Sequence, residues 1–332
     1  MLVTHNPKKE STDKSIFINR NIPNEAIDLL TTAGFRLLVW EGDQVLPNDE
    51  INELLKDCDA FLSTGAITIT PQLLQDKPKL KIVSQASAGY NNIAIEEASS
   101  LNICVANAPG TMNKATADIA FTLMLNASRK MFYMNQLIKE GKWEAFKFTD
   151  FLGQELHGKT LGVFGLGNIG YEMAKLCKAA YNMDIIYHNR SKNEQAETTL
   201  DANYVSFDEL VEKSDVISVH CNLTTETKGV FNKEIFSKMK PTSIFINVAR
   251  GGVHVEEDLI EALQTNSIWG AGLDVTNPEP MEKDNPLLFM ENVAVTPHIG
   301  SATTTARTAM AMLAAQNIID FFEGKSLSTK VN

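Results

Sequence analysis

The sequence contains few cysteines, and the four that occur lie far apart. Cys58, Cys104, Cys177 and Cys221 include no pair with C-x-x-C spacing, which disfavours a zinc site, a redox motif and a disulfide framework. The pattern is typical of reduced, mostly buried thiols in an intracellular protein. We therefore expect no bound metal.

Basic residues and long apolar runs are also scarce. Lys and Arg number 30 against 41 Asp and Glu, a formal net charge of −11. An acidic chain is poorly suited to bind nucleic acid or an anionic membrane surface. Residues 1–15 are too polar for a signal peptide, and the apolar stretch 119–125 is too short to span a bilayer. These features favour a cytoplasmic protein without nucleic-acid or membrane partners.

The chain is rich in short apolar segments that alternate with helical patterns. At 332 residues it exceeds what one hydrophobic core usually serves, so two domains are expected. The alternation predicts an α/β fold with parallel sheets covered by helices on both faces. The expected strands are 15–19, 36–40, 60–63, 82–85, 103–106, 160–164, 183–187, 216–220, 244–248, 270–274 and 293–296, with long helices at 115–129 and 303–322.

One glycine motif organises the second half of the chain. Gly165, Gly167 and Gly170 form G-x-G-x-x-G, after the apolar strand 160–164 and before a helical stretch and another strand. A strand, a tight turn and a helix N-terminus bring backbone N–H groups together where a pyrophosphate can bind. The motif predicts dinucleotide binding through the turn, including Leu166, Asn168 and Ile169. Two alternatives remain: a turn that serves helix–sheet packing alone, and a site for another adenosine ligand.

The end of the next strand indicates which dinucleotide binds. A site for NAD usually has an acid about 20 residues after the glycines, which accepts hydrogen bonds from the ribose. This chain has neutral Asn189 there, followed by Arg190, Ser191 and Lys192. Cations and a hydroxyl can bind a 2′-phosphate that a carboxylate would repel. We expect NADP(H) to be preferred; the alternative is that Arg190 stacks on adenine and NAD(H) also works.

Polar residues follow several expected strands at what should be one edge of the sheet. Arg250 follows strand 244–248, Asp274 ends strand 270–274 with Glu279 just beyond it, and His298 follows strand 293–296. Ligands of open parallel sheets bind at the carboxyl ends of the strands. An arginine can hold a carboxylate and polarise a carbonyl, a histidine can donate a proton, and a carboxylate can orient that histidine. Taken singly, each residue is more typical of a solvated or ion-paired surface group.

Several motifs together resemble the NAD(P)-dependent D-isomer-specific 2-hydroxyacid dehydrogenases. The resemblance covers nearly the whole chain, with mild departures at Asn91 and Asp118, where an acid and Glu are common. The matching segments are the glycine motif, Ser87-Ala-Gly89, Thr116-Ala-Asp118, Val248-Ala-Arg-Gly-Gly252, Gly272-Leu-Asp-Val275, Pro278-Glu-Pro280 and Thr296-Pro-His-Ile-Gly300.

The resemblance implies a domain plan and a role for individual residues. A flavodoxin-like substrate domain of residues 1–110, to which 300–332 return, would carry an inserted Rossmann coenzyme domain of residues 111–299. Arg250 would bind the substrate, His298 would be the general acid/base and Glu279 its partner. Ala66, Ser87, Ala88 and Gly89 would line the substrate site. Further cofactor contacts would come from Thr116, Leu223, Thr227, Val248, Ala249, Asp274 and Gly300.

Within the family, the expected use of NADPH, the segment Ile18-Asn-Arg-Asn-Ile-Pro23 and Thr116-Ala-Asp118 most resemble glyoxylate/hydroxypyruvate reductases. The implied reaction is hydride transfer to a small 2-keto acid, glyoxylate to glycolate or hydroxypyruvate to D-glycerate. A D-lactate-type or broader dehydrogenase and a non-catalytic, dinucleotide-sensing corepressor are the alternatives. The resemblance also implies a homodimer, for which the aromatic connection 141–155 could cover the partner; packing against its own domain is the other interpretation.

Overall fold

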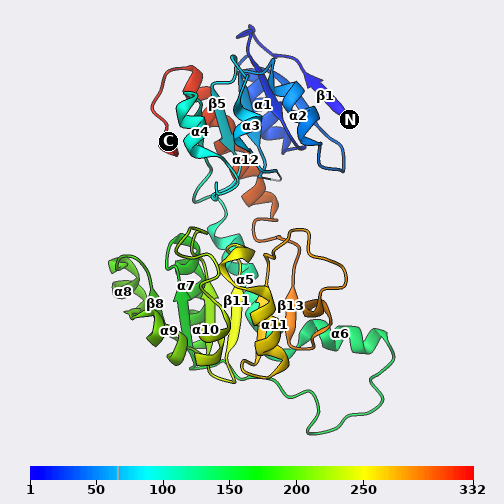
Figure 1. Cartoon of the computed structure of the whole chain (residues 1–332), viewed down its shortest axis with the longest axis vertical. Coiled ribbons are helices and arrows are strands. Elements are labelled where there is room, and N and C mark those ends of the chain that lie inside the picture. Colours follow the sequence, from blue (N-terminus) through cyan, green and yellow to red (C-terminus); the bar gives the residue numbers. More distant parts are fainter. Residues whose placement is uncertain (66) are drawn as a thin grey trace. The chain divides into compact units, whose positions relative to one another are not determined.

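The computed structural model describes residues 1–65 and 67–332, which form two compact units (Figure 1). Unit 1 combines Met1–Met112 with Ala302–Asn332, and unit 2 is Asn113–Ser301. The domain boundaries expected from the sequence, at residues 110 and 299, fall close to these limits. Ala66, expected in the substrate site, lies outside the described residues.

Unit 1 contains a six-stranded sheet. Its order is β1-β3-β2-β4-β5-β6, parallel except for β1, which pairs antiparallel with β3. Without β1, this is the flavodoxin-like strand order. The strands are β1 (Leu2–His5), β2 (Ser15–Ile18), β3 (Arg36–Trp40), β4 (Ala60–Ser63), β5 (Ile82–Gln85) and β6 (Cys104–Ala106).

The edge strand β1 was not expected from the sequence. Its four residues alternate between exposed and partly buried positions, so none lies in the core. A short edge strand buries little apolar surface, which leaves a weak signal in the sequence.

In the described part of unit 1, five helices pack on the sheet. Helix α12 joins α1 and the central strands in one hydrophobic core, and the Ser84 hydroxyl donates to the Ala314 carbonyl at 2.8 Å. The C-terminal helix therefore belongs structurally to the N-terminal residues. The helices are α1 (Asn24–Thr32), α2 (Asn48–Leu55), α3 (Pro71–Leu74), α4 (Ile95–Ser100) and α12 (Thr304–Phe322).

Unit 2 contains a seven-stranded parallel sheet. Its order, β13-β12-β11-β10-β7-β8-β9, is the Rossmann order with one further strand. The two-residue β9 was not expected, because both its residues are exposed. The strands are β7 (Thr160–Phe164), β8 (Asp184–His188), β9 (Asn203–Tyr204), β10 (Val216–Val219), β11 (Ile244–Asn247), β12 (Gly270–Leu273) and β13 (Val293–Val295).

Helices cover both faces of this sheet. One hydrophobic cluster lies beneath α5, α7 and α8, and a second lies beneath α9, α10 and α11. The helices are α5 (Asn113–Arg129), α6 (Met131–Lys139), α7 (Asn168–Tyr181), α8 (Glu194–Leu200), α9 (Phe207–Lys213), α10 (Lys233–Lys238) and α11 (Glu256–Gln264), with 3-10 turns η1 (Gly251–Val253) and η2 (Pro286–Phe289). The expected α/β class with two parallel-sheet units is confirmed. In the described part of the chain, no helix has the length and apolar character needed to cross a membrane.

Candidate active site

The glycine motif forms a tight turn between β7 and α7. The Gly165 N–H donates to the His188 carbonyl at 3.0 Å, and the Gly167 N–H donates to the Gly165 carbonyl at 2.8 Å. A Cβ atom at Gly165, where φ is +96°, would lie 2.6 Å from the Cys221 nitrogen, so a side chain is excluded there.

The space in front of this turn suits a pyrophosphate. Among the described residues, a Cβ atom placed on Gly167 would have no neighbour within 4 Å, and no side chain caps α7. The N–H groups of the first helical turn therefore have no cap and can bind an anion. The residues present fit a dinucleotide.

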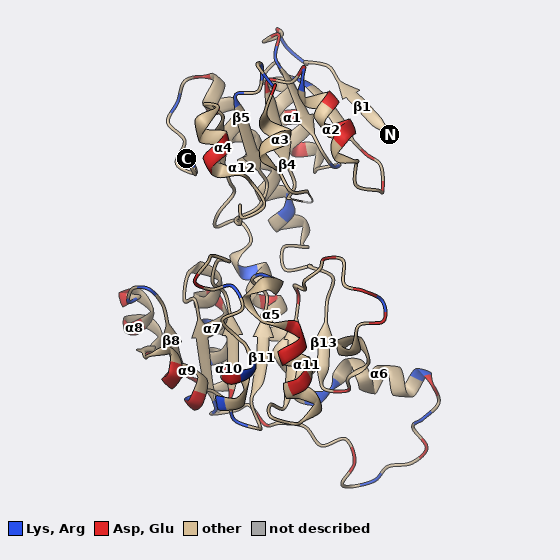
Figure 2. Ribbon diagram, in the orientation of Figure 1, with Lys and Arg blue, Asp and Glu red and all other residues tan. Residues whose placement is uncertain are grey.

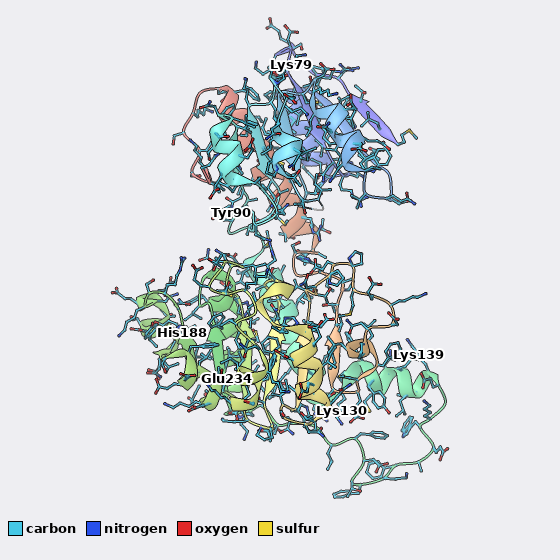
Figure 3. All side chains as sticks on the ribbon, viewed as in Figure 1. Lys79, Tyr90, Lys130, Lys139, His188 and Glu234 are labelled. Carbon is cyan, nitrogen blue, oxygen red and sulfur yellow. The ribbon has the colours of Figure 1, made fainter. Side chains whose placement is uncertain are left out.

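The end of β8 carries cations and no acid. His188, labelled in Figure 3, closes the strand, and Figure 2 shows basic residues in the loop that leads into α8. Arg190, Ser191 and Lys192 are exposed. Hydrogen bonds, chiefly from Thr224, lower the pKa of the Glu226 carboxyl, and the charge of Arg190 adds to this effect. Glu226 therefore lies within electrostatic range of this loop.

The side chain of Asn189 is engaged by the glycine turn. Its Oδ1 accepts from the Leu166 N–H at 2.6 Å, and its Nδ2 donates to the Leu166 carbonyl at 3.2 Å. Leu166 itself is 1% exposed. Both residues were expected at the cofactor from the sequence, but the hydrogen bonds between them were not.

The loops after β10 and β11 hold four more of the expected cofactor residues. Val248 and Ala249 are buried directly after β11. Leu223 lies 3.3 Å from the position of a Cβ atom on Gly252, so the two loops are in contact. The Thr227 hydroxyl donates to the Asn222 carbonyl at 2.7 Å and accepts from the Thr224 N–H at 2.8 Å, which closes the loop after β10.

Arg250 is positioned by Asn247, which was not among the residues expected in the site. The Asn247 side chain at the end of β11 donates to the Arg250 carbonyl at 2.9 Å and accepts from the Ala249 N–H at 2.9 Å. Its amide nitrogen also lies 3.1 Å from Nδ1 of buried His254. Burial lowers the pKa of Arg250, and the negative charge of Glu279 partly opposes this shift. The guanidinium nevertheless keeps its charge at neutral pH. In the sequence, Asn247 is the single polar residue of the expected strand 244–248, which was its signal.

His298 and Glu279 form a hydrogen-bonded pair. Nδ1 of His298 lies 2.8 Å from Oε2 of Glu279, while Oε1 of Glu279 accepts from the Thr276 N–H at 3.0 Å. The side chains are 50% and 39% exposed, so a small molecule can reach them. Partial burial raises the pKa of Glu279, but the His298 contact, the Thr276 N–H and Arg250 together hold that pKa below its usual value. Glu279 is therefore ionised at neutral pH.

Asp274 shapes the turn that presents His298. Its carboxylate accepts from the Thr296 hydroxyl at 2.6 Å, the Ile299 N–H at 2.8 Å and the Gly300 N–H at 2.7 Å, and the residue is 1% exposed. His298 has φ +52°, in the left-handed region that residues other than glycine adopt infrequently. By resemblance, Asp274 was expected on the cofactor side; these bonds were not expected.

Thr116 braces the same turn from α5. Its hydroxyl donates to the Gly300 carbonyl at 3.1 Å, and a Cβ atom on Gly300 would lie 3.1 Å from the Thr116 methyl group. The two expected cofactor residues thus meet in the structure, at the N-terminal end of α5.

In unit 1, the loop Ser87–Gly89 is held by side chains from two strand ends. Gln85 Nε2 donates to the Gly89 carbonyl at 2.6 Å, and Asn107 Nδ2 donates to the Ala88 carbonyl at 2.7 Å. The Ser87 hydroxyl closes the loop on the Gly89 carbonyl at 2.7 Å. Neither Gln85 nor Asn107 was singled out from the sequence, because a polar residue at a strand end is common.

No ligand set for a metal is found among residues 1–65 and 67–332. Within these ranges, no three or more His, Cys, Asp or Glu side chains gather in a way that could hold an ion.

Comparisons with known proteins agree with this geometry. Residues 121–300 match the family model "D-isomer specific 2-hydroxyacid dehydrogenase, NAD binding domain". The glyoxylate reductase of Pyrococcus furiosus is 40% identical over 321 residues, which cover 96% of this chain and 95% of that protein. The corresponding enzyme of Thermococcus litoralis is 39% identical, with 96% of each chain covered.

Solved structures give the same result. An NADPH-dependent glyoxylate/hydroxypyruvate reductase from Sinorhizobium meliloti, in complex with NADP and malonate, superposes with a TM-score of 0.83 at 28% identity, covering 96% of this chain and 97% of that one. A glyoxylate reductase from Paecilomyes thermophila gives 0.84 at 29% identity, covering 96% and 98%. The resemblance noted in the sequence is confirmed: the chain belongs to the D-isomer specific 2-hydroxyacid dehydrogenases and is an NAD(P)-dependent enzyme of that family.

Proposed function

We propose that this enzyme reduces a small 2-keto acid, glyoxylate or hydroxypyruvate, with NADPH as its preferred cofactor. The observation that carries the proposal is the His298–Glu279 pair at 2.8 Å, on the strand ends of the unit that holds the glycine turn and Arg250. The names of the relatives from Pyrococcus furiosus and Sinorhizobium meliloti support the substrate class. The products would be glycolate and D-glycerate.

The pair assigns a task to each ring nitrogen of His298. Because Nδ1 faces Glu279, Nε2 is the nitrogen that can donate a proton to the substrate oxygen. Glu279 orients the ring and stabilises its positive charge. Arg250 binds the substrate carboxylate and polarises the adjacent carbonyl. When bound, the reduced nicotinamide supplies the hydride for C2.

The remaining expected residues would bind the cofactor and the carboxylate. The turn from Gly165 to Gly170 and the N-terminus of α7 would hold the pyrophosphate. Arg190 and Ser191 would bind the 2′-phosphate, and backbone N–H groups of Ser87–Gly89 would bind the substrate carboxylate. The nicotinamide and adenine sides would be formed by Thr116, Leu223, Thr227, Val248, Ala249, Asp274 and Gly300.

Cofactor choice is tested by kcat/KM for NADPH and NADH at a fixed keto-acid concentration. We expect a preference for NADPH of about tenfold or more, because a guanidinium–phosphate pair contributes well over 1 kcal/mol. Arg190→Ala should reduce this preference. Lys159→Ala is the matched control, because exposed Lys159 lies before β7, at the opposite edge of the sheet. A tenfold preference for NADH would refute the proposal.

Substrate choice is tested with glyoxylate, hydroxypyruvate, pyruvate and bulkier 2-keto acids under the same conditions. The highest kcat/KM should fall on glyoxylate or hydroxypyruvate. The highest value on pyruvate would instead indicate a D-lactate-type or broader dehydrogenase. Absence of turnover with every keto acid and both cofactors would indicate a dinucleotide sensor.

A homodimer is the assembly that we propose for this enzyme. The support is the segment from α6 to residue 152, which Figure 1 shows extending away from the sheet of unit 2 and which exposes large apolar side chains. The most exposed are Trp143 at 63%, Phe146 at 84%, Phe148 at 86% and Leu152 at 64%. Light scattering should give twice the chain mass, and the double variant Phe146→Asp with Phe148→Asp should reduce it. A monomeric mass for the unmodified protein would contradict the assembly.

A further inference from the structure

We propose that Asn189 is a positioning residue, which holds the pyrophosphate-binding turn through Leu166 and does not contact the cofactor ribose. This inference rests on the proposed function, since it concerns how the same dinucleotide is bound. It differs from the ordinary expectation for this position, where a side chain at the end of the second Rossmann strand binds the ribose directly.

Both polar atoms of the Asn189 carboxamide are used by one residue of the turn. Oδ1 accepts from the Leu166 N–H at 2.6 Å, and Nδ2 donates to the Leu166 carbonyl at 3.2 Å. A backbone N–H can only donate and a carbonyl can only accept, so the orientation of the amide is determined. To reach a ribose hydroxyl, the side chain would have to break this two-point contact.

Leu166 is held both by its buried side chain and by hydrogen bonds to its backbone. Its side chain is 1% exposed in the hydrophobic core beneath α5 and α7, and it lies between two glycines. Its carbonyl accepts a second hydrogen bond from Asn193 Nδ2 at 3.0 Å. Without the contact to Asn189, the Leu166 N–H would lose its acceptor in a turn whose neighbouring glycines are flexible, although the Asn193 bond to the Leu166 carbonyl would remain. The two hydrogen bonds between Asn189 and Leu166, called the clasp below, therefore maintain the position of the N–H groups that would bind the pyrophosphate.

The clasp is itself anchored in the adjoining strands. The Tyr204 hydroxyl donates to the Asn189 carbonyl at 3.0 Å. Asn193 donates its backbone N–H to the Tyr187 hydroxyl at 2.8 Å and accepts from the Ala196 N–H at 3.1 Å, where it caps α8. These bonds connect the turn after β7 to the end of β8 and to the start of α8.

An aspartate cannot replace this asparagine in the clasp. Its second carboxylate oxygen would occupy the Nδ2 position, 3.2 Å from the Leu166 carbonyl, where two acceptors repel each other. Charge alone predicts that Asn189→Asp improves NADH binding. The clasp predicts that Asn189→Asp improves neither cofactor, because the turn loses one of its supports.

The experiment measures Kd for two fragments, by calorimetry on the full chain, well below its unfolding temperature. ADP-ribose contains the pyrophosphate but no 2′-phosphate, whereas 2′-AMP contains the 2′-phosphate but no pyrophosphate. Loss of the two neutral hydrogen bonds in Asn189→Ala should weaken ADP-ribose binding about three- to tenfold. Binding of 2′-AMP should change less than about twofold. Asn203→Ala is the matched control, because Asn203 on β9 is exposed and its side chain makes a long bond of 3.5 Å to the Asp201 carbonyl.

Three results would overturn the proposal. The first is an equal loss of both fragments in Asn189→Ala, which indicates direct contact with the adenosine ribose. The second is unchanged ADP-ribose binding in that variant. The third is a tenfold gain in NADH affinity in Asn189→Asp. If Asn189→Ala does not fold, Asn189→Ser, which retains a hydroxyl beside the turn but not the two-point contact, should also weaken ADP-ribose and leave 2′-AMP nearly unchanged.

Failure of the NADPH proposal would be distinguishable from failure of this one. Arg190→Ala should weaken 2′-AMP and leave ADP-ribose nearly unchanged; the absence of that effect would count against the 2′-phosphate site alone. The ADP-ribose measurements contain no 2′-phosphate, so they test Asn189 whichever cofactor the enzyme prefers.

Discussion

The buried imidazole of His254 should make the protein less stable in mild acid. His254 is 4% exposed, and burial lowers its pKa from 6.5 to about 4. Its Nδ1 accepts from Asn247, whose amide also donates to the Arg250 carbonyl. Protonation at Nδ1 would replace this acceptor with a donor, so the folded chain resists it.

The sign and size of the effect follow from proton linkage. Below pH 6.5 the unfolded chain binds a proton at His254, whereas the folded chain does not until about pH 4. The free energy of unfolding contributed by His254 is therefore fully present above pH 6.5 and is lost as pH falls toward 4. Between pH 7 and pH 5 the loss is about 2 kcal/mol.

Urea unfolding at pH 7 and pH 5 measures this loss. His254→Gln keeps an acceptor for Asn247 but cannot titrate. Between pH 7 and pH 5, this variant should therefore lose about 2 kcal/mol less stability than the unmodified protein. Exposed His157 supplies the control: His157→Gln should retain the full pH dependence. Equal pH dependence in His254→Gln and the unmodified protein would refute the reasoning. If His254→Gln does not fold, the imidazole resonance of His254 in the unmodified protein should show no titration between pH 7 and pH 5.

Changes at the active site and the glycine turn should separate binding from chemistry. His298→Gln should lower kcat by about 10²–10⁴ with little change in NADPH affinity, because the proton donor is lost; a retained kcat would remove His298 from that role. Arg250→Ala should abolish keto-acid turnover and leave NADPH binding measurable by fluorescence, and unchanged KM for the keto acid would contradict its role. Glu279→Gln should lower kcat for reduction, since the His298 ring loses the carboxylate that faces Nδ1 and orients it; an unchanged kcat would count against the pairing. Gly170→Ala should weaken both cofactors, because its Cβ atom would lie 2.8 Å from the Gly165 carbonyl, and unchanged Kd values would show that the turn can adjust.

Much of the fold could be predicted because its signals are local. Apolar runs of four or five residues separated by helical spacing predicted the strands of both sheets, and the glycine spacing predicted the turn after β7. The elements that were missed, such as β1 and β9, bury almost nothing and leave no periodic pattern. Helix α6, which was also not expected, buries only Leu137.

The sequence by itself determined the order of β–α units, the glycine turn and the residue types available at the strand ends. Only the tertiary structure decided how these polar groups are used, because their partners lie far along the chain. Asn189 forms a hydrogen bond with Leu166, 23 residues away in the sequence, and Asp274 forms one with Gly300, 26 residues away. Most hydrogen bonds need donor–acceptor distances of about 2.7–3.2 Å, which segments far apart in the sequence reach only when they pack together. Asp274, placed at the cofactor by resemblance, therefore proves to hold the turn that presents His298.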